Sequence, residues 1–243
     1  METARRVARR QTGNERTYAD LLRVVDEWRL FGGEIGGGEE WSKLTRALLA
    51  FPADEAFNDR IFEIWCLREI AGSVLRQGAQ LIEGPNSLTL NRVRPIYAFA
   101  LGEKRIELWF QKALNKQHAR WTYSDSNQGL RGIPDITVIA EGIHYLVVDA
   151  KNRSVQGNTR PEETYKMLGY FENFRPLLGG ATNWAVLCFV SLNGFVQQLC
   201  SPDSRRVLLT SAHPQVAAQC TFPAQIDAGM AEWMRRWRNG QLV

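Results

Sequence analysis

The stretch GIPDITVIAEGIHYLVVDAKNR, residues 132–153, contains the strongest structural signal in the chain. It holds two runs rich in β-branched residues, 136–140 and 143–148, separated by a Glu-Gly pair typical of a tight turn. The segment is therefore predicted to form a β-hairpin. A turn centred on that glycine places Asp135 opposite Asp149, and directly opposed residues point to the same face of a sheet.

An acidic pair with a nearby lysine is expected at the open end of this hairpin. Lys151 lies two residues beyond Asp149, so its side chain shares the face of both aspartates. Two carboxylates this close repel each other and raise each other's pKa. A divalent cation bound between them removes that penalty, and oxygen ligands on a hard ion favour Mg²⁺ or Mn²⁺.

The same residues carry a family resemblance. Pro134-Asp135 followed by Asp149-Ala150-Lys151 resembles the PD-(D/E)xK signature of restriction-endonuclease-like nucleases. Residues 61–66, IFEIWC, are similar to the Glu-x-Trp helix that precedes the core in McrC-like nuclease domains. Residues 164–170, TYKMLGY, are similar to the helix that follows the Asp-x-Lys strand in that group. McrC-like nuclease domains belong to prokaryotic restriction and defence systems.

The resemblance implies an α/β (α+β) fold with a restriction-endonuclease-like core. In that fold a mixed central β-sheet is flanked by helices, and here extra N- and C-terminal helices are expected. The resemblance also implies that Asp135, Asp149 and Lys151 are catalytic. It further implies that the backbone carbonyl of Ala150 is a metal ligand and that Glu63 completes the metal shell.

Each of these residues also fits a structural role. Asp135 fits a turn cap, and Asp149 fits an exposed strand end paired with Lys151 or Arg153. Glu63 lies on an apolar helical stripe. A glutamate there either has a cation beside it or lies at the rim of the core. Two accessory candidates, Lys166 and Tyr170, are four residues apart and share one helical face. Related nucleases often place a glutamine where Lys166 stands, and Tyr170 equally fits the core.

Basic and aromatic residues alternate around the hairpin, as expected for a groove that contacts DNA phosphates. The basic candidates are Lys112, Lys116, Arg120, Arg131 and Arg153. They are interleaved with Trp109, Trp121 and Tyr123. A mixed, solvated surface is the equal alternative, and the net charge of +4 is compatible with both interpretations.

The functional hypothesis is a metal-dependent endonuclease that hydrolyses phosphodiester bonds in DNA. One ion or a pair would activate water, while Lys151 would support charge on the phosphate. The resemblance implies the nuclease component of a prokaryotic restriction or phage-defence system, with a targeting or NTPase protein as partner and possible oligomers. Two alternatives use the same fold: a non-cleaving nucleic-acid-binding or assembly subunit, and an RNase.

Composition excludes several other classes. The four cysteines are scattered without a C-x-x-C pair, which argues against a zinc site or a disulfide framework. No run approaches the roughly 20 apolar residues of a membrane span, and the N-terminus lacks the apolar region of a signal peptide. A cytoplasmic location without membrane contact is therefore expected.

The chain divides into a basic tail at 1–16, a helical subdomain at 17–57 and a nuclease domain with a C-terminal helix at 58–243. Within the last part, a helix is expected from Asn58 or Asp59 to about Arg76, and another from about Pro161 to Phe174, with Pro176 as its stop. The remaining expected elements are strands at 88–90, 96–101, 106–110, 184–190 and 207–209, and a last helix at about 223–239.

Overall fold

The computed structural model describes residues 55–86, 88, 93–141, 144–155, 161–178, 184–192, 197–202, 205–213 and 220–239. The expected basic tail and nearly all of the expected N-terminal helical subdomain lie outside these residues. The first described element is helix α4, Glu55–Arg76, which begins before the expected caps Asn58 and Asp59.

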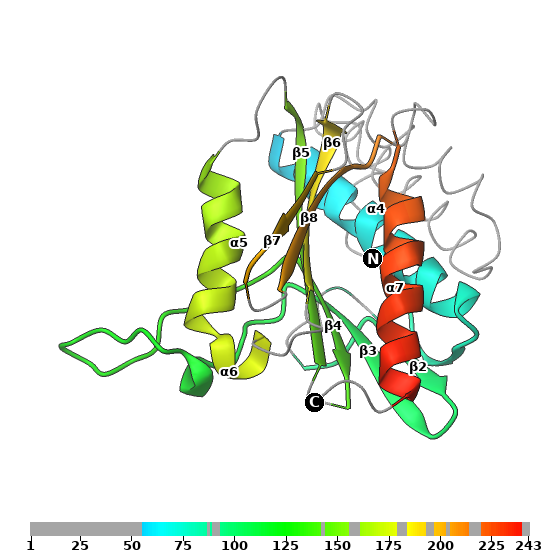
Figure 1. The fold of residues 1–243 in the computed structure, drawn as a ribbon, viewed down its shortest axis with the longest axis horizontal. Helices are drawn as coiled ribbons and strands as arrows, with labels where there is room; N and C mark the ends of the chain where they lie inside the picture. The colour runs from blue at the N-terminus through cyan, green and yellow to red at the C-terminus, as the bar shows by residue number, and fades with distance from the viewer. Residues whose placement is uncertain are drawn as a thin grey trace, which may run out of the picture. The chain divides into compact units, whose positions relative to one another are not determined.

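A mixed β-sheet forms the centre of the fold (Figure 1). Within the described residues it has eight strands in the order β1-β2-β3-β4-β5-β6-β8-β7. The strands are β1 Gln80–Glu83, β2 Tyr97–Leu101, β3 Lys104–Phe110, β4 Ile136–Ala140, β5 His144–Val155, β6 Trp184–Leu192, β7 Gln197–Cys200 and β8 Arg206–Ser211. The pairings from β1–β2 to β4–β5 are antiparallel, β5–β6 and β6–β8 are parallel, and β7 pairs antiparallel with β8. This mixed sheet confirms the predicted fold class.

The predicted β4–β5 hairpin is present with the predicted register. Ile136 pairs with Val148, and Ala140 pairs with His144. The next positions outward along the two strands are Asp135 and Asp149, so the pairing that the turn residues predict brings the two acids together. Strand β5 also runs further than expected, as far as Val155.

Helices cover both faces of the sheet. Helix α4 lies on one face together with α7, Phe222–Arg238, while α5, Pro161–Asn173, and α6, Arg175–Leu178, lie on the other (Figure 1). Successive residues of β5 therefore pack into different cores, so the strand is buried on both faces from Leu146 to Ala150. Leu146 and Val148 pack towards α4, and Val147 packs towards α5.

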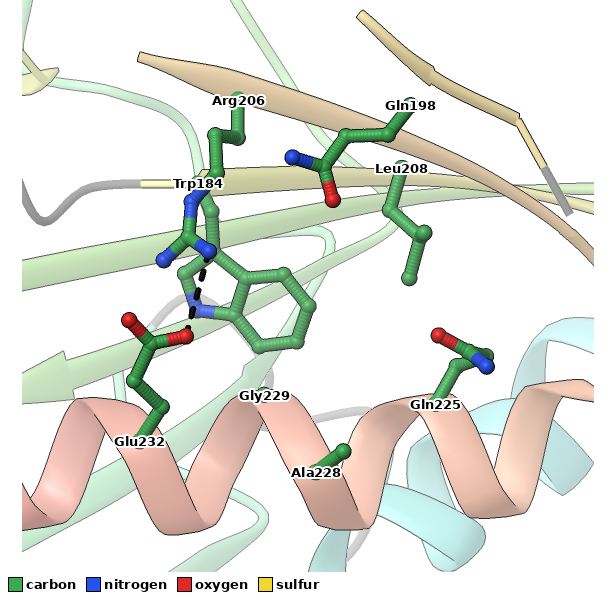
Figure 2. Close-up of a pocket in the computed structure, with 8 residues that line it drawn as sticks. All are labelled: Trp184, Gln198, Arg206, Leu208, Gln225, Ala228, Gly229 and Glu232. Atoms are coloured by element: carbon green, nitrogen blue, oxygen red, sulfur yellow. Dashed lines mark hydrogen bonds and ion pairs between the residues drawn. The ribbon is translucent and has the colours of Figure 1, made fainter. Parts of the chain in front are cut away.

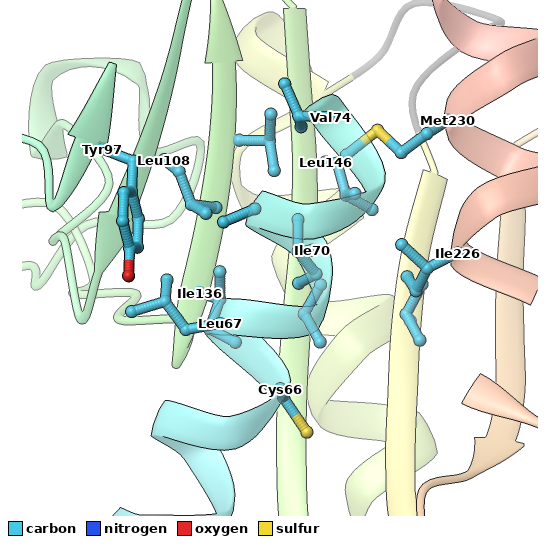
Figure 3. Packing of buried hydrophobic residues seen from close by; sticks show 14 of the residues in the cluster. Cys66, Leu67, Ile70, Val74, Tyr97, Leu108, Ile136, Leu146, Ile226 and Met230 are labelled. Carbon is cyan, nitrogen blue, oxygen red and sulfur yellow. The ribbon is translucent and has the colours of Figure 1, made fainter. Parts of the chain in front are cut away.

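The larger core lies between α4, α7 and the sheet. Figure 3 shows part of it, with side chains contributed by Cys66, Leu67, Ile70, Val74, Tyr97, Leu108, Ile136, Leu146, Ile226 and Met230. Helix α4 supplies residues at helical spacing, which is why an apolar stripe in the sequence predicted this packing. The stripe fixes the rotation of α4 about its axis, and with it the position of Glu63.

Several local expectations differ from the structure. Strands β1 and β7 were not expected, and Leu88 is not in a strand, while residues 89 and 90 lie outside the described part. Helix α5 ends at Asn173, within one residue of the expected end, but Pro176 lies in the first turn of a further short helix, α6, where a missing backbone N–H costs nothing. None of the described helices is both long and apolar enough to cross a membrane.

Candidate active site

Asp135 is held by backbone hydrogen bonds from both neighbouring strands. The backbone N–H of Ala150, in β5, donates to Asp135 Oδ2 at 2.8 Å. The N–H of Gln111, directly after β3, donates to the Asp135 carbonyl at 2.7 Å. The acid directly before β4 is thus fixed in position by the sheet, and its side chain is only 11% exposed.

Two lysines bind the carboxylate of Asp149, which is fully buried. Lys151 Nζ lies 2.7 Å from Asp149 Oδ2, and Lys166 Nζ lies 2.7 Å from Oδ1. Lys151 Nζ is also 3.5 Å from Asp135 Oδ2 and 3.4 Å from the Ala150 carbonyl oxygen. We call Asp135, Asp149, Lys151 and Lys166 the carboxylate–lysine site.

The two aspartates have opposite electrostatic environments. Burial and the nearby charge of Asp149 together raise the pKa of Asp135 to about 7, although the charge of Lys151 acts in the opposite direction. Burial alone would raise the pKa of Asp149 as well, but Lys151 and Lys166 outweigh burial and lower it. Asp149 is therefore the charged member of the pair at neutral pH, and Asp135 readily holds a proton.

Tyr170 supports the backbone that leads into Asp135. Its side chain is buried in the core beside α5, and its hydroxyl donates to the Ile133 carbonyl at 3.0 Å. Burial raises the pKa of Tyr170. Gly132 packs close by, because a Cβ there would lie 2.5 Å from the ring of Phe174. Lys166 Nζ lies 5.6 Å from the centroid of the Tyr170 ring. Both accessory candidates therefore lie at the carboxylate–lysine site.

Glu63 approaches the site from α4 but has partners of its own. Its Oε2 accepts hydrogen bonds from Gln111 Nε2 and Arg60 Nη1, each at 3.1 Å. Burial raises the pKa of Glu63, and charges on Lys151 and Asp149 contribute to that pKa. The charges of the site therefore act on the Glu63 carboxylate. Its role as a metal ligand stays a prediction.

The donor atoms of the site suit a hard cation. Asp135 and Asp149 offer carboxylate oxygens and Ala150 offers its carbonyl, the oxygen ligands that Mg²⁺ and Mn²⁺ prefer. Asp149 Oδ2 is buried and lies 2.7 Å from Lys151 Nζ, and a carboxylate oxygen with one such contact keeps a lone pair for a further ligand. In the described part of the chain no three acidic, histidine or cysteine side chains gather closely enough to form a complete ligand set.

Three of the five basic candidates contact an aromatic ring or a carboxylate. Lys112 Nζ lies 3.4 Å from the centroid of the Trp109 ring. Arg120 forms an ion pair with Glu172, and Arg153 forms one with Glu163 of α5. The other two, Lys116 and Arg131, have exposed side chains. Phosphate binding by these residues stays a prediction.

Sequence reasoning missed Gln111, which contacts both Asp135 and Glu63. Its backbone has φ of 48°, in the left-handed region that is uncommon for glutamine. This conformation turns the chain out of β3 towards the site. No motif marks the position in the sequence.

A separate cavity of about 160 Å³ lies on the other face of the sheet, between α7 and strands β6 to β8 (Figure 2). Arg206 Nη1 donates to Glu232 Oε2 at 3.1 Å across its rim. The Trp184 ring packs flush against α7 at Gly229, where a Cβ would lie 2.2 Å from the ring. Trp184 belongs to the core shared with α4 and α7, whereas Asp149 faces α5.

The fold and site together define a mixed-sheet α/β protein with a carboxylate–lysine cluster at the open end of a central hairpin. No family model and no curated protein matches the sequence. Among solved structures, the chain is similar to a chain in the Thermococcus gammatolerans assembly of McrB AAA+ hexamers with bound McrC, at a TM-score of 0.39 and 13% identity. The likeness covers 94% of this chain and 50% of that chain, so this chain spans about half the length of the matched one.

Proposed function

We propose that this protein is a metal-dependent endonuclease that hydrolyses phosphodiester bonds in DNA. The observation that carries the proposal is the convergence of Asp135, Asp149 and Lys151. Lys151 Nζ lies within 3.5 Å of a carboxylate oxygen of each aspartate. An ammonium and two carboxylates in this arrangement suit the chemistry that phosphodiester hydrolysis requires, and they belong to the residues that carry the PD-(D/E)xK resemblance.

The residues have separable roles in this proposal. Asp135, Asp149 and the Ala150 carbonyl would hold a Mg²⁺ or Mn²⁺ ion. Such an ion lowers the pKa of water and offsets charge on the scissile phosphate. Lys151 directs its ammonium to the same point and would stabilise charge that develops on the phosphate oxygens. Lys166 adds a second ammonium from α5 and would contact the same phosphate.

The wider role follows from the sequence resemblance to McrC-like nucleases. We infer a component of a prokaryotic restriction or phage-defence system, in which a targeting or NTPase protein directs cleavage. The motifs of residues 61–66 and 164–170 support this extension. McrC-like nucleases often have a glutamine where this chain has Lys166. Lys166 contacts Asp149, so this difference lies within the site itself.

Incubation of the purified chain with supercoiled plasmid, single-stranded DNA and single-stranded RNA tests the proposal. We expect nicking of DNA with Mg²⁺ or Mn²⁺ and none with EDTA. Asp149→Asn and Lys151→Ala should abolish nicking, whereas Asp227→Asn should not. Asp227 pairs with Arg76 on the face of the sheet opposite Asp149, so it controls for the loss of a charged aspartate.

Three results would contradict the proposal. Nicking by Asp149→Asn at the parental rate would show that the activity arises elsewhere. Cleavage of RNA alone would favour an RNase. Binding to DNA with no cleavage under either ion would favour a non-cleaving subunit on the same fold.

A further inference from the structure

Residues 119–131, which connect η2 (Lys116–His118) to the segment before β4, form an ordered hairpin. Thr122 pairs with Gly129 in an antiparallel bridge. Leu130 N donates to the Trp121 carbonyl at 2.8 Å, and Tyr123 N donates to the Gln128 carbonyl at 2.9 Å. In Figure 1 this is the green loop that extends outward beyond α6. We call it the aromatic hairpin.

The base of the aromatic hairpin is fixed to the end of α5. Asn173, which is buried, accepts hydrogen bonds from Arg120 N on its backbone carbonyl, at 2.8 Å, and from Trp121 N on Oδ1, at 2.9 Å. Gly129 approaches η2 so closely that a Cβ there would lie 2.4 Å from the Lys116 carbonyl oxygen. The hairpin is thus held in one position by contacts at its base.

One face of this hairpin carries large apolar side chains in solvent. Residues directly opposed across an antiparallel pair share a face, as do residues two apart on a strand. By this rule Trp121, Tyr123 and Leu130 lie on one face. Their exposed fractions are 62%, 55% and 38%. Aromatic rings gain most from burial, so a fixed platform that keeps two of them in solvent indicates a surface covered by a partner.

The positive residues around the platform favour a polyanion as its partner. Residues 111–131 contain four lysines and arginines against a single acid, Asp125, and one of the four, Arg120, is paired with Glu172 of α5. Lys116 and Arg131 flank the platform with exposed side chains. The chain from Leu130 to Asp135 has five steps, so the platform lies at most about 17 Å along the backbone from the carboxylate–lysine site. That distance corresponds to roughly five base pairs of duplex DNA.

We propose that the aromatic hairpin stacks on unpaired bases of single-stranded DNA, beside the point of cleavage. This inference rests on the proposed nuclease function and names its substrate as DNA with an open strand, either single-stranded or at a junction. Bases inside a duplex already cover each other's faces, whereas unpaired bases expose faces on which Trp121 and Tyr123 can stack. The basic residues beside them hold the phosphates between successive bases.

Binding of the full-length chain to a fluorescein-labelled oligonucleotide, measured by anisotropy in EDTA, tests this inference without cleavage. The double variant Trp121→Ala, Tyr123→Ala should lose affinity for the single strand by on the order of ten- to a hundredfold, and for the matching duplex by far less. Ile82→Ala is the control, since Ile82 is a 52% exposed apolar residue of β1. It should bind both forms as the parent does.

The outcomes separate this inference from the proposed function. Unchanged single-strand affinity in the double variant, or an equal loss for duplex, would overturn base stacking. A parent chain that binds neither form would also overturn it and would favour a protein partner for the platform. If the parent binds the single strand through these aromatics but cuts no DNA with Mg²⁺ or Mn²⁺, the platform stands and the nuclease proposal fails.

Discussion

Replacing Lys166 by glutamine should strengthen metal binding by the protein alone. In the structure each oxygen of Asp149 contacts one ammonium at 2.7 Å, so an ion near Asp149 meets positive charge already in place. Lys166→Gln removes one of these charges and retains a hydrogen-bond donor of similar length.

The magnitude follows from Coulomb's law with a correction for solvent. Two unit charges about 4 Å apart interact by about 1 kcal/mol in water and about 4 kcal/mol at an effective dielectric constant of 20. The Lys166 side chain is 40% exposed, so the lower part of that interval applies, and solvent screening limits the effect further. A divalent ion feels twice the repulsion of a unit charge, which gives about 2 kcal/mol, or roughly thirtyfold in affinity.

Titration of Mn²⁺ into the full chain by calorimetry, without DNA, measures this effect. Lys104→Gln is the matched control, because Lys104 Nζ lies over the Trp237 ring at 4.7 Å and serves α7 instead of the site. We expect tighter Mn²⁺ binding in Lys166→Gln alone. Equal or weaker binding than in the parent would refute the argument that Lys166 and the ion compete for Asp149.

The same substitution should act on stability in the opposite direction. The pKa of Asp149 is lowered in the folded state, so this group stabilises the protein above its unfolded pKa and loses that contribution as pH falls through the folded pKa. Lys166→Gln raises the folded pKa and therefore lowers the free energy of unfolding at neutral pH. Urea denaturation at pH 7 without metal should show a loss of about 1 kcal/mol.

Three further predictions concern separate contacts. Gly229→Ala should lower the free energy of unfolding by about 1–3 kcal/mol, because its Cβ meets the buried Trp184 ring, whereas Gly169→Ala, which meets nothing within 4 Å, should not destabilise in the same urea experiment. Tyr170→Phe should slow cleavage while circular dichroism stays unchanged, since only the hydrogen bond to the segment before Asp135 is lost; parental turnover would contradict this role. Mn²⁺ affinity should rise between pH 6 and pH 8, because Asp135, whose pKa is about 7, must lose its proton to bind a cation; a flat titration would contradict it.

The hairpin could be predicted because local chemistry specifies it completely. β-Branched runs set the strands, the Glu-Gly turn sets the register, and the register alone brings Asp135 next to Asp149. The observed pairing of Ile136 with Val148 confirms the strands and their register, whereas Gly142 of the expected turn lies outside the described residues. The buried face of α4 could be predicted in the same way, since the apolar residues at helical spacing lie on one face of the helix and pack together.

Edge strands and lysine contacts could not be predicted in this way. Strand β7 is exposed at every position, so its sequence lacks the alternation that marks a half-buried strand. The contact between Lys166 and Asp149 depends on how α5 is rotated against the sheet. Buried residues such as Met167 and Phe171 set that rotation through packing, which no spacing within a single segment reveals.

The charges of the carboxylate–lysine site explain how two buried acids persist in the folded chain. Asp135 and Asp149 carry up to two negative charges, and Lys151 and Lys166 carry two positive ones, so the cluster is compensated without an ion. Compensation keeps the apo protein folded but leaves little net charge to attract a cation. A DNA phosphate that binds the two ammonium groups would release the carboxylates for the ion. Substrate and metal would then each favour the binding of the other by the same factor, because linkage between two sites is reciprocal.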